Sequence, residues 1–149
     1  MAKPASSPIP QGLTSITPYL LCRDGNAAIE FYKKAFGAVE VMRLPGPDGR
    51  VGHACLRIGN AAVMLAEPCT EDAKNVPEAG TAPGCAPVSV HLYVDDVDSV
   101  FEQAIKSGAS VIMEPQDMFW GDRYARLTDP SGHQWSIATQ KFEMTPEEM

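Results

Sequence analysis

The chain contains no long hydrophobic run: nowhere in its 149 residues does a segment approach the ~20 apolar residues of a membrane-spanning helix. Basic residues are also few, with 12 lysines and arginines against 19 aspartates and glutamates, for a formal net charge of −7. This balance argues against nucleic acid and anionic membranes as partners, because both attract basic surfaces. The opening residues MAKPASSPIPQG have no apolar stretch for a signal peptide, so we expect a cytoplasmic protein.

Cysteine is scarce and is not arranged as a metal-binding or redox motif. The 4 cysteines, Cys22, Cys55, Cys69 and Cys85, form no CxxC pair. Reduced thiols are the expected state in a cytoplasmic protein. A disulfide between Cys69 and Cys85 is the less favoured alternative.

What the sequence does contain is an internal repeat. Asp24 opens an apolar-periodic helix that ends at Gly37, and Asp96 opens another that ends at Gly108, at an offset of about 72 residues. In each half, one strand precedes the helix and three follow it. A mixed unit of this length is a duplicated half-domain rather than a solenoid repeat. Two such βαβββ halves can bury one core and leave a cup for a small molecule.

The predicted organisation is one α+β domain over residues 13–140, in which two tandem βαβββ modules form a curved mixed sheet with a ligand cup. Between the modules, a segment rich in Pro, Gly and Ala has no periodicity, and we expect a mobile linker or a flap over the cup. The boundaries are a disordered N-terminal tail at 1–12, modules at 13–67 and 88–140, a linker at 68–87 and an acidic C-terminal tail at 141–149.

Strand alternation predicts which side chains line the cup. Around residues 88–94 the aliphatic side chains point to one face and the polar ones to the other, and the same alternation recurs in two further strands. A solvated sheet face would also be polar, but bulky Tyr, His and Arg side chains favour a ligand site. The residues predicted to bind the ligand are His53, Arg57, Ser89, His91, Tyr93, Tyr124 and Arg126, with Trp120 near the rim.

Three segments carry a resemblance to a known family: ITPYLLCRDGNAAIEFYKKAFGA, HLYVDDVDSVFEQAIKSGA and GDRYARLTDPSGHQWSIAT. Together with the order of elements, they closely resemble the vicinal oxygen chelate superfamily, and within it the glyoxalase/bleomycin-resistance group and its PhnB-like relatives. The resemblance covers about residues 13–140. It is specific for the fold but not for activity, because the superfamily includes lyases, isomerases, dioxygenases, antibiotic-modifying enzymes and binding proteins.

The resemblance also implies where metal ligands would stand. Metal-dependent members place a ligand, usually His, about seven residues before the helix-capping Asp, and a Glu about four residues after the glycine of the DPxG turn. In this chain those positions hold Thr17, Ser89 and Ser136. Neutral hydroxyls are poor ligands for divalent transition metals, so the usual triad is absent from the sequence.

A displaced metal site is the alternative. His53 and His91 are expected to line the cup, and Glu67 ends the strand predicted at 61–67. Two imidazoles and a carboxylate would suit zinc, nickel or iron. The competing interpretation is that both histidines are ordinary hydrogen-bonding residues. Likewise, Arg57 and Arg126 either clamp a carboxylate or pair with acidic neighbours.

From these features we expect a homodimeric protein of the glyoxalase/bleomycin-resistance type that holds a small organic ligand without a cofactor. A role in antibiotic resistance by sequestration follows from the resemblance. Planar or cationic aromatic compounds suit an acidic protein with aromatic cup residues. The alternative is a metal-dependent lyase, isomerase or dioxygenase that uses the displaced site. The sequence leaves open whether the protein is an enzyme.

Metal content separates these two hypotheses. Because Thr17, Ser89 and Ser136 replace the usual ligands, we predict that the purified protein carries no stoichiometric transition metal and has no metal-dependent glyoxalase activity. Elemental analysis that finds about one zinc, nickel or iron per chain would contradict this. Loss of that metal in His53→Ala or His91→Ala would then establish the displaced site.

Overall fold

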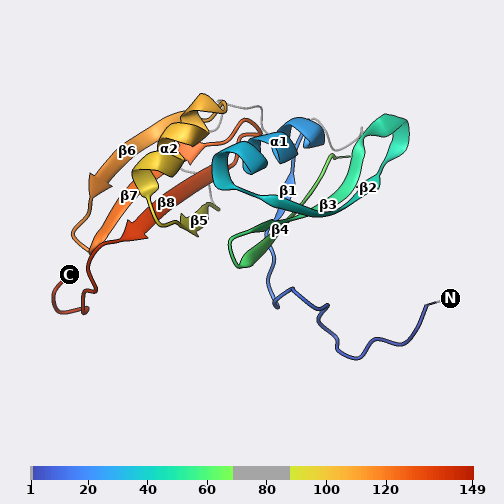
Figure 1. The fold of residues 1–149 in the computed structure, drawn as a ribbon, viewed down its shortest axis with the longest axis horizontal. Helices are drawn as coiled ribbons and strands as arrows, with labels where there is room; N and C mark the ends of the chain where they lie inside the picture. The colour runs from blue at the N-terminus through green and yellow to red at the C-terminus, as the bar shows by residue number, and fades with distance from the viewer. Residues whose placement is uncertain (1, 69–87) are drawn as a thin grey trace.

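The structure, a computed structural model, describes residues 2–68 and 88–149 (Figure 1). Apart from Pro68, the predicted linker lies outside these residues, as do Cys69, Cys85 and the alternative disulfide between them. In module one the elements are β1 (Tyr19–Leu21), α1 (Gly25–Phe36), β2 (Val39–Pro45), the short 3-10 helix η1 (Pro47–Gly49), β3 (Val51–Ile58) and β4 (Ala61–Ala66). In module two they are β5 (Val90–Tyr93), α2 (Val97–Lys106), β6 (Ser110–Asp117), β7 (Asp122–Thr128) and β8 (Gln134–Gln140).

The predicted fold class is confirmed, with one four-stranded mixed sheet in each module. The strand orders are β1-β4-β3-β2 and β5-β8-β7-β6, so the two modules share one topology. The first strand of each module runs parallel to the last, and the remaining pairs are antiparallel. In the described residues, no helix is long and apolar enough to cross a membrane.

Both helices begin and end where their sequences predict. Asp24 accepts a hydrogen bond from the Ala27 N–H, and Asp96 accepts one from Ser99, so each aspartate caps a helix N-terminus. Gly37 follows α1 with a φ of 67°, a left-handed conformation that glycine adopts without steric cost.

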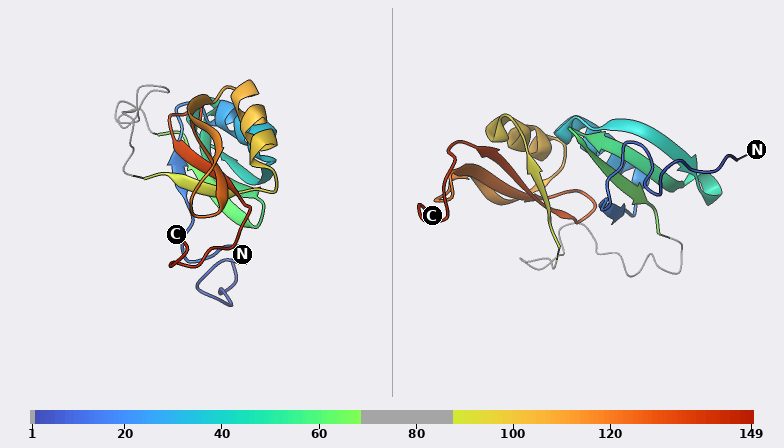
Figure 2. Two further views of the ribbon diagram at one scale, coloured as in Figure 1. Left: turned by 90° about the vertical axis from the view of Figure 1, so that its left-hand side faces the viewer. Right: turned by 90° about the horizontal axis from the view of Figure 1, so that it is seen from below.

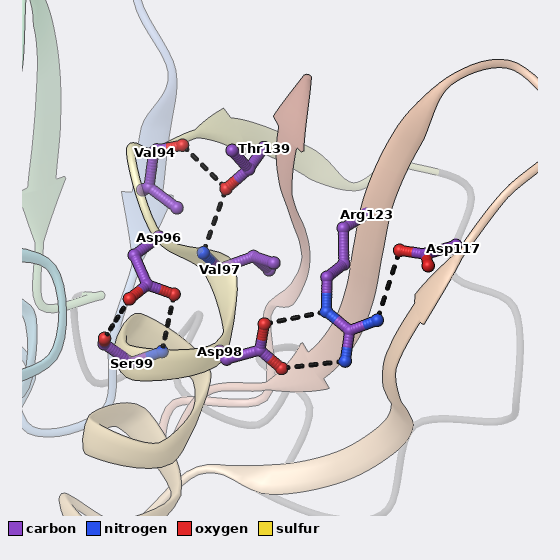
Figure 3. Close-up of polar contacts among 8 residues, drawn as sticks. All are labelled: Val94, Asp96, Val97, Asp98, Ser99, Asp117, Arg123 and Thr139. Atoms are coloured by element: carbon purple, nitrogen blue, oxygen red, sulfur yellow. Dashed lines mark hydrogen bonds and ion pairs between the residues drawn. The ribbon is translucent and has the colours of Figure 1, made fainter. Parts of the chain in front are cut away.

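Helix α2 is fixed to its sheet by side chains of β7 and β8 (Figure 3). The Thr139 hydroxyl donates to the Val94 carbonyl and accepts from the Val97 N–H, both at 2.9 Å. It therefore ties the end of β5 to the first turn of α2. On the other side of the helix start, Arg123 makes a bidentate pair with Asp98 at 2.7 and 3.0 Å. These contacts hold β5, and with it the side chains of His91 and Tyr93, in a defined position.

The hydrophobic core lies between each sheet and its helix. In β8, Trp135 and Ile137 are buried against the helix side, while the alternating Ser136 and Ala138 belong to the opposite face. Burial of this apolar surface is the main favourable term in folding. It fixes which way each strand turns, and so determines which side chains remain on the concave face.

The two modules lie end to end along the long axis of the molecule, and α1 packs against α2 (Figures 1 and 2). Rings of α1 also reach the sheet of module two: Phe36 lies 4.7 Å and Tyr32 5.6 Å from Trp135, measured between ring centroids. At this junction Asp129, which is 2% exposed, accepts hydrogen bonds from the Tyr32 hydroxyl at 2.5 Å and the Trp135 indole at 2.9 Å. A single carboxylate therefore joins module one to module two.

Asp129 also shapes the turn in which it stands. Its Oδ1 accepts from the backbone N–H groups of Ser131 and His133 at 2.9 and 3.0 Å. Burial alone would raise the pKa of Asp129, but His133, whose Nδ1 lies 3.5 Å from Oδ2, and the hydrogen bonds from Tyr32 and Trp135 lower that pKa below its usual value of 3.8.

We predict that Asp129→Asn lowers the free energy of unfolding by about 2–4 kcal/mol, because it removes a charged acceptor from two buried donors. Since the folded-state pKa of Asp129 is lowered, its contribution is complete above the unfolded pKa and is lost as the pH falls through the folded pKa. Urea unfolding at a series of pH values between about 3 and 7 should therefore show that the free energy of unfolding falls less steeply toward low pH in the variant than in the wild type.

The matched control is Asp48→Asn. Asp48 is exposed in a turn with a φ of 57°, which asparagine also tolerates, so this variant should stay within about 0.5 kcal/mol of the wild type. Equal losses for Asp129→Asn and Asp48→Asn would show that the carboxylate does not join the modules.

Candidate functional site

The concave face of module two gathers four of the predicted residues. His91 and Arg126 both pair with Ser136 across the sheet, and Tyr93 and Tyr124 both pair with Ala138. Residues paired in this way project from the same face. His91, Tyr93, Tyr124 and Arg126 are thus neighbours on the side of the sheet opposite α2.

His91 is held by a hydroxyl at one of the positions where metal-dependent relatives carry a ligand. Its Nδ1 lies 2.6 Å from the Oγ of Ser136. Partial burial lowers the pKa of His91, and the negative charge of Asp122 acts weakly in the opposite direction. The imidazole is therefore neutral at physiological pH and can donate or accept one hydrogen bond.

The aromatic rings on this face form one continuous cluster. The His91 ring lies 4.7 Å from that of Tyr93 and 6.1 Å from that of Tyr124, and Trp120 lies 5.3 Å from Tyr124, all between centroids. Phe119 extends the cluster, with its ring 5.0 Å from that of Trp120. Edge-to-face and stacked arrangements of this kind present flat apolar surfaces to a planar ligand.

A carboxylate joins two rings of the aromatic cluster. Asp122 Oδ2 accepts from the Tyr93 hydroxyl at 3.0 Å and from the Trp120 indole at 3.1 Å. These bonds set the orientation of both rings, and the bond to Asp122 raises the pKa of Tyr93, so its phenol remains a donor. Asp122 was not among the residues predicted from the sequence.

A cavity of about 540 Å³ opens beside the cluster. It is lined by Tyr93, Val94, Asp95, Thr139 and Gln140. Gln140 is the cross-strand partner of Asp122, so the cavity adjoins the buried carboxylate. Its size suits a small organic molecule, since ligand pockets typically span about 300–1,000 Å³.

The predicted C-terminal tail contributes to the position of Trp120. The backbone N–H groups of Lys141 and Phe142 both donate to the carbonyl of Gly121. Gly121 has a φ of 97°, and a Cβ at this position would lie 2.3 Å from the Phe142 carbonyl oxygen. The loop that carries Trp120 therefore requires glycine here and is packed against the start of the tail.

Two predicted residues of module two, Arg126 and Ser89, are not part of the aromatic cluster. Arg126 donates to the Gln134 side chain at 3.3 Å. It makes no ion pair within the described residues. Ser89 precedes β5 and is exposed.

Module one presents a different face. The Tyr19 hydroxyl lies 2.8 Å from Nδ1 of His53, and the two rings are 5.5 Å apart. Arg57 donates to the Gly12 carbonyl at 2.7 Å and so holds the segment that precedes β1. The Arg57 guanidinium therefore binds a backbone carbonyl of its own chain and is not directed to an open site.

The displaced metal set is not brought together within the described chain. His53 and His91 lie in different modules, each with its own hydrogen-bond partner. Glu67 accepts from the Gly25 N–H and forms an ion pair with Arg50 at 2.8 Å, near the start of α1. Across residues 2–68 and 88–149, no three or more His, Cys, Asp or Glu side chains are grouped to hold a metal ion. Thr17, at the remaining usual position, precedes β1 and is half-buried.

Comparison with known proteins is consistent with this architecture. A family model described as Glyoxalase/Bleomycin resistance protein/Dioxygenase superfamily matches residues 12–137. An uncharacterised protein of Mycobacterium bovis, Mb0911c, is 42% identical over 135 residues, which are 91% of this chain and 89% of that protein.

Solved structures share the fold. TioX from Micromonospora sp. ML1 superposes with a TM-score of 0.61 at 25% identity, covering 85% of this chain and 99% of TioX. A PhnB protein from Bacillus cereus superposes with a TM-score of 0.64 at 18% identity, covering 85% of this chain and 99% of that one.

Proposed function

The chain belongs to the glyoxalase/bleomycin resistance protein/dioxygenase superfamily, and on that premise we propose that it binds a small organic molecule on the concave face of module two. The observation that carries this proposal is the aromatic cluster of His91, Tyr93, Trp120 and Tyr124 around Asp122, beside a cavity of about 540 Å³. Flat rings with a few fixed polar groups are the typical lining of a small-molecule site.

We favour ligand binding without catalysis over an enzymatic function. The positions that hold metal ligands in metal-dependent relatives are Thr17, Ser89 and Ser136 here, and the Ser136 hydroxyl is occupied by His91. Glu67, the carboxylate of the displaced set, is neutralised by Arg50. Among the described residues, no group of metal-ligating side chains favours a lyase, isomerase or dioxygenase. Sequestration of a toxic compound such as an antibiotic is a role that binding alone can fill.

We further propose that the protein is a homodimer. The concave face of module one carries exposed apolar side chains, with Tyr19 51%, Leu21 44%, Met42 39% and Leu44 51% accessible. Contiguous exposed apolar side chains mark interaction surfaces. A second copy of this chain is the occupant we propose.

Ligand binding is tested by titration with planar aromatic compounds, followed by calorimetry. We predict that Tyr93→Ala or Trp120→Ala weakens binding by about 1–3 kcal/mol, because each removes a ring that would stack on the ligand. The control is Val111→Ala, which truncates an exposed apolar side chain on β6 and should leave affinity unchanged. A ligand whose affinity neither Tyr93→Ala nor Trp120→Ala alters would place the site elsewhere.

The dimer is tested by size-exclusion chromatography with light scattering, which measures the mass of the eluted protein. We predict that the wild type has twice the mass of one chain and that Leu44→Glu shifts it to a monomer, because a charge in an apolar interface is costly. Ile112→Glu, an exposed apolar position on β6, is the control and should remain dimeric. A monomeric wild type at tens of micromolar would contradict the proposal.

A further inference from the structure

Asp122 is a buried carboxylate beside which the described residues place no cation. The residue is 4% exposed, and none of the lysines, arginines or histidines of the described residues forms an ion pair with it. Buried charges in proteins are normally paired, because removal from water is unfavourable for an isolated ion. By contrast, the buried carboxylates Glu67 and Asp129 have Arg50 and His133, respectively, within 4 Å.

The hydrogen bonds of Asp122 leave one of its oxygens available. Oδ2 accepts both hydrogen bonds, and both donors, the Tyr93 hydroxyl and the Trp120 indole N–H, are neutral. Within the described part of the chain, Oδ1 receives no hydrogen bond, and it is not among the buried polar atoms that lack a partner. Oδ1 therefore has an acceptor position that no described residue fills.

The surroundings of Asp122 favour positive charge. The Tyr93 hydroxyl and the Trp120 indole N–H both reach the carboxylate, so the two rings lie beside it. An aromatic face attracts a cation that comes within about 6 Å of the ring centroid. Among the described residues that line the adjoining cavity, Asp95 is the one charged residue, and Gln140 adds an amide. Since none of these described lining residues is basic, an anionic ligand would be repelled by Asp95 without compensation from them.

We propose that the ligand of this site carries an organic ammonium group, which Asp122 binds between the rings of Tyr93 and Trp120. The proposal rests on the function proposed above and names its ligand class: a quaternary or protonated amine attached to an apolar or aromatic body. The ammonium completes the missing ion pair of Asp122, and the aromatic body packs on the cluster of His91 and Tyr124.

A pair of probes with one shape and different charge tests this ligand class. Benzyltrimethylammonium carries a positive charge where neopentylbenzene has a carbon atom, and both are titrated into the full chain. We predict that the wild type binds the cation more tightly than the neutral compound by on the order of tenfold. Asp122→Asn keeps the size of the side chain and its acceptor oxygen, and should remove most of this preference. Glu102→Gln removes an equal charge from an exposed position on α2 and should retain it.

Each result decides one of the two proposals. Equal affinity of both probes for the wild type, or a preference that survives in Asp122→Asn, overturns the ammonium site while the binding function stands. Failure of both probes and of neutral planar aromatics to bind overturns the binding function itself.

A second variant provides an independent test of the ammonium site if Asp122→Asn does not fold. Tyr93→Phe keeps the ring and the carboxylate but removes the hydroxyl that bonds to Oδ2. If charge selects the ligand, this variant keeps the preference for the cation within about threefold. Complete loss of the preference in Tyr93→Phe would show that the hydroxyl, and not the charge of Asp122, recognises the ligand.

Discussion

The Asp129 carboxylate is the interaction on which the arrangement of the two modules depends. It is buried at their junction and binds the Tyr32 hydroxyl of α1, the Trp135 indole of β8 and two backbone N–H groups of its own turn. Fixing Trp135 on the helix side of the sheet fixes its neighbour Ser136 on the concave side. From there Ser136 holds His91. A constraint in the core thus determines a side-chain orientation in the site.

Duplication produced two modules with one topology and two different concave faces. Tyr19 and Tyr93 both lie on the first strand of their own module and pair with its last strand. Tyr19 bonds to His53, among exposed apolar side chains. Tyr93 bonds to a buried carboxylate within an aromatic cluster. The first environment suits a protein surface and the second a charged small molecule.

The fold and the sheet face of several residues of the candidate site could be predicted from local patterns. Period-two alternation placed His91, Tyr93, Tyr124 and Arg126 on one face of the sheet. Because successive side chains of a strand point to opposite faces, the aliphatic side chains that pack under α2 direct the intervening ones to the other face. The capping aspartates and the repeat offset predicted both helices.

The hydrogen-bond and ion-pair partners of individual side chains could not be predicted in the same way, because these partners are distant in the sequence. Arg57 binds the Gly12 carbonyl, and Glu67 binds Arg50 and the Gly25 N–H instead of approaching a histidine. Asp122 was missed because an aspartate after a Trp-Gly turn is typical of a solvated loop. The signal was nevertheless present, since extending the alternation from Arg126 through Tyr124 leads to Asp122.

The central claim is that the concave face of module two, built around Asp122, is the ligand site. The chain has 2 tryptophans, Trp120 in that site and Trp135 in the core, so their indole N–H signals report on the two places separately. The most direct measurement is a titration of the ¹⁵N-labelled protein with benzyltrimethylammonium, followed by proton–nitrogen correlation spectra. The account predicts that the Trp120 indole signal moves in a saturable way while the Trp135 signal stays in place. A saturable shift of other signals with Trp120 unmoved would contradict it.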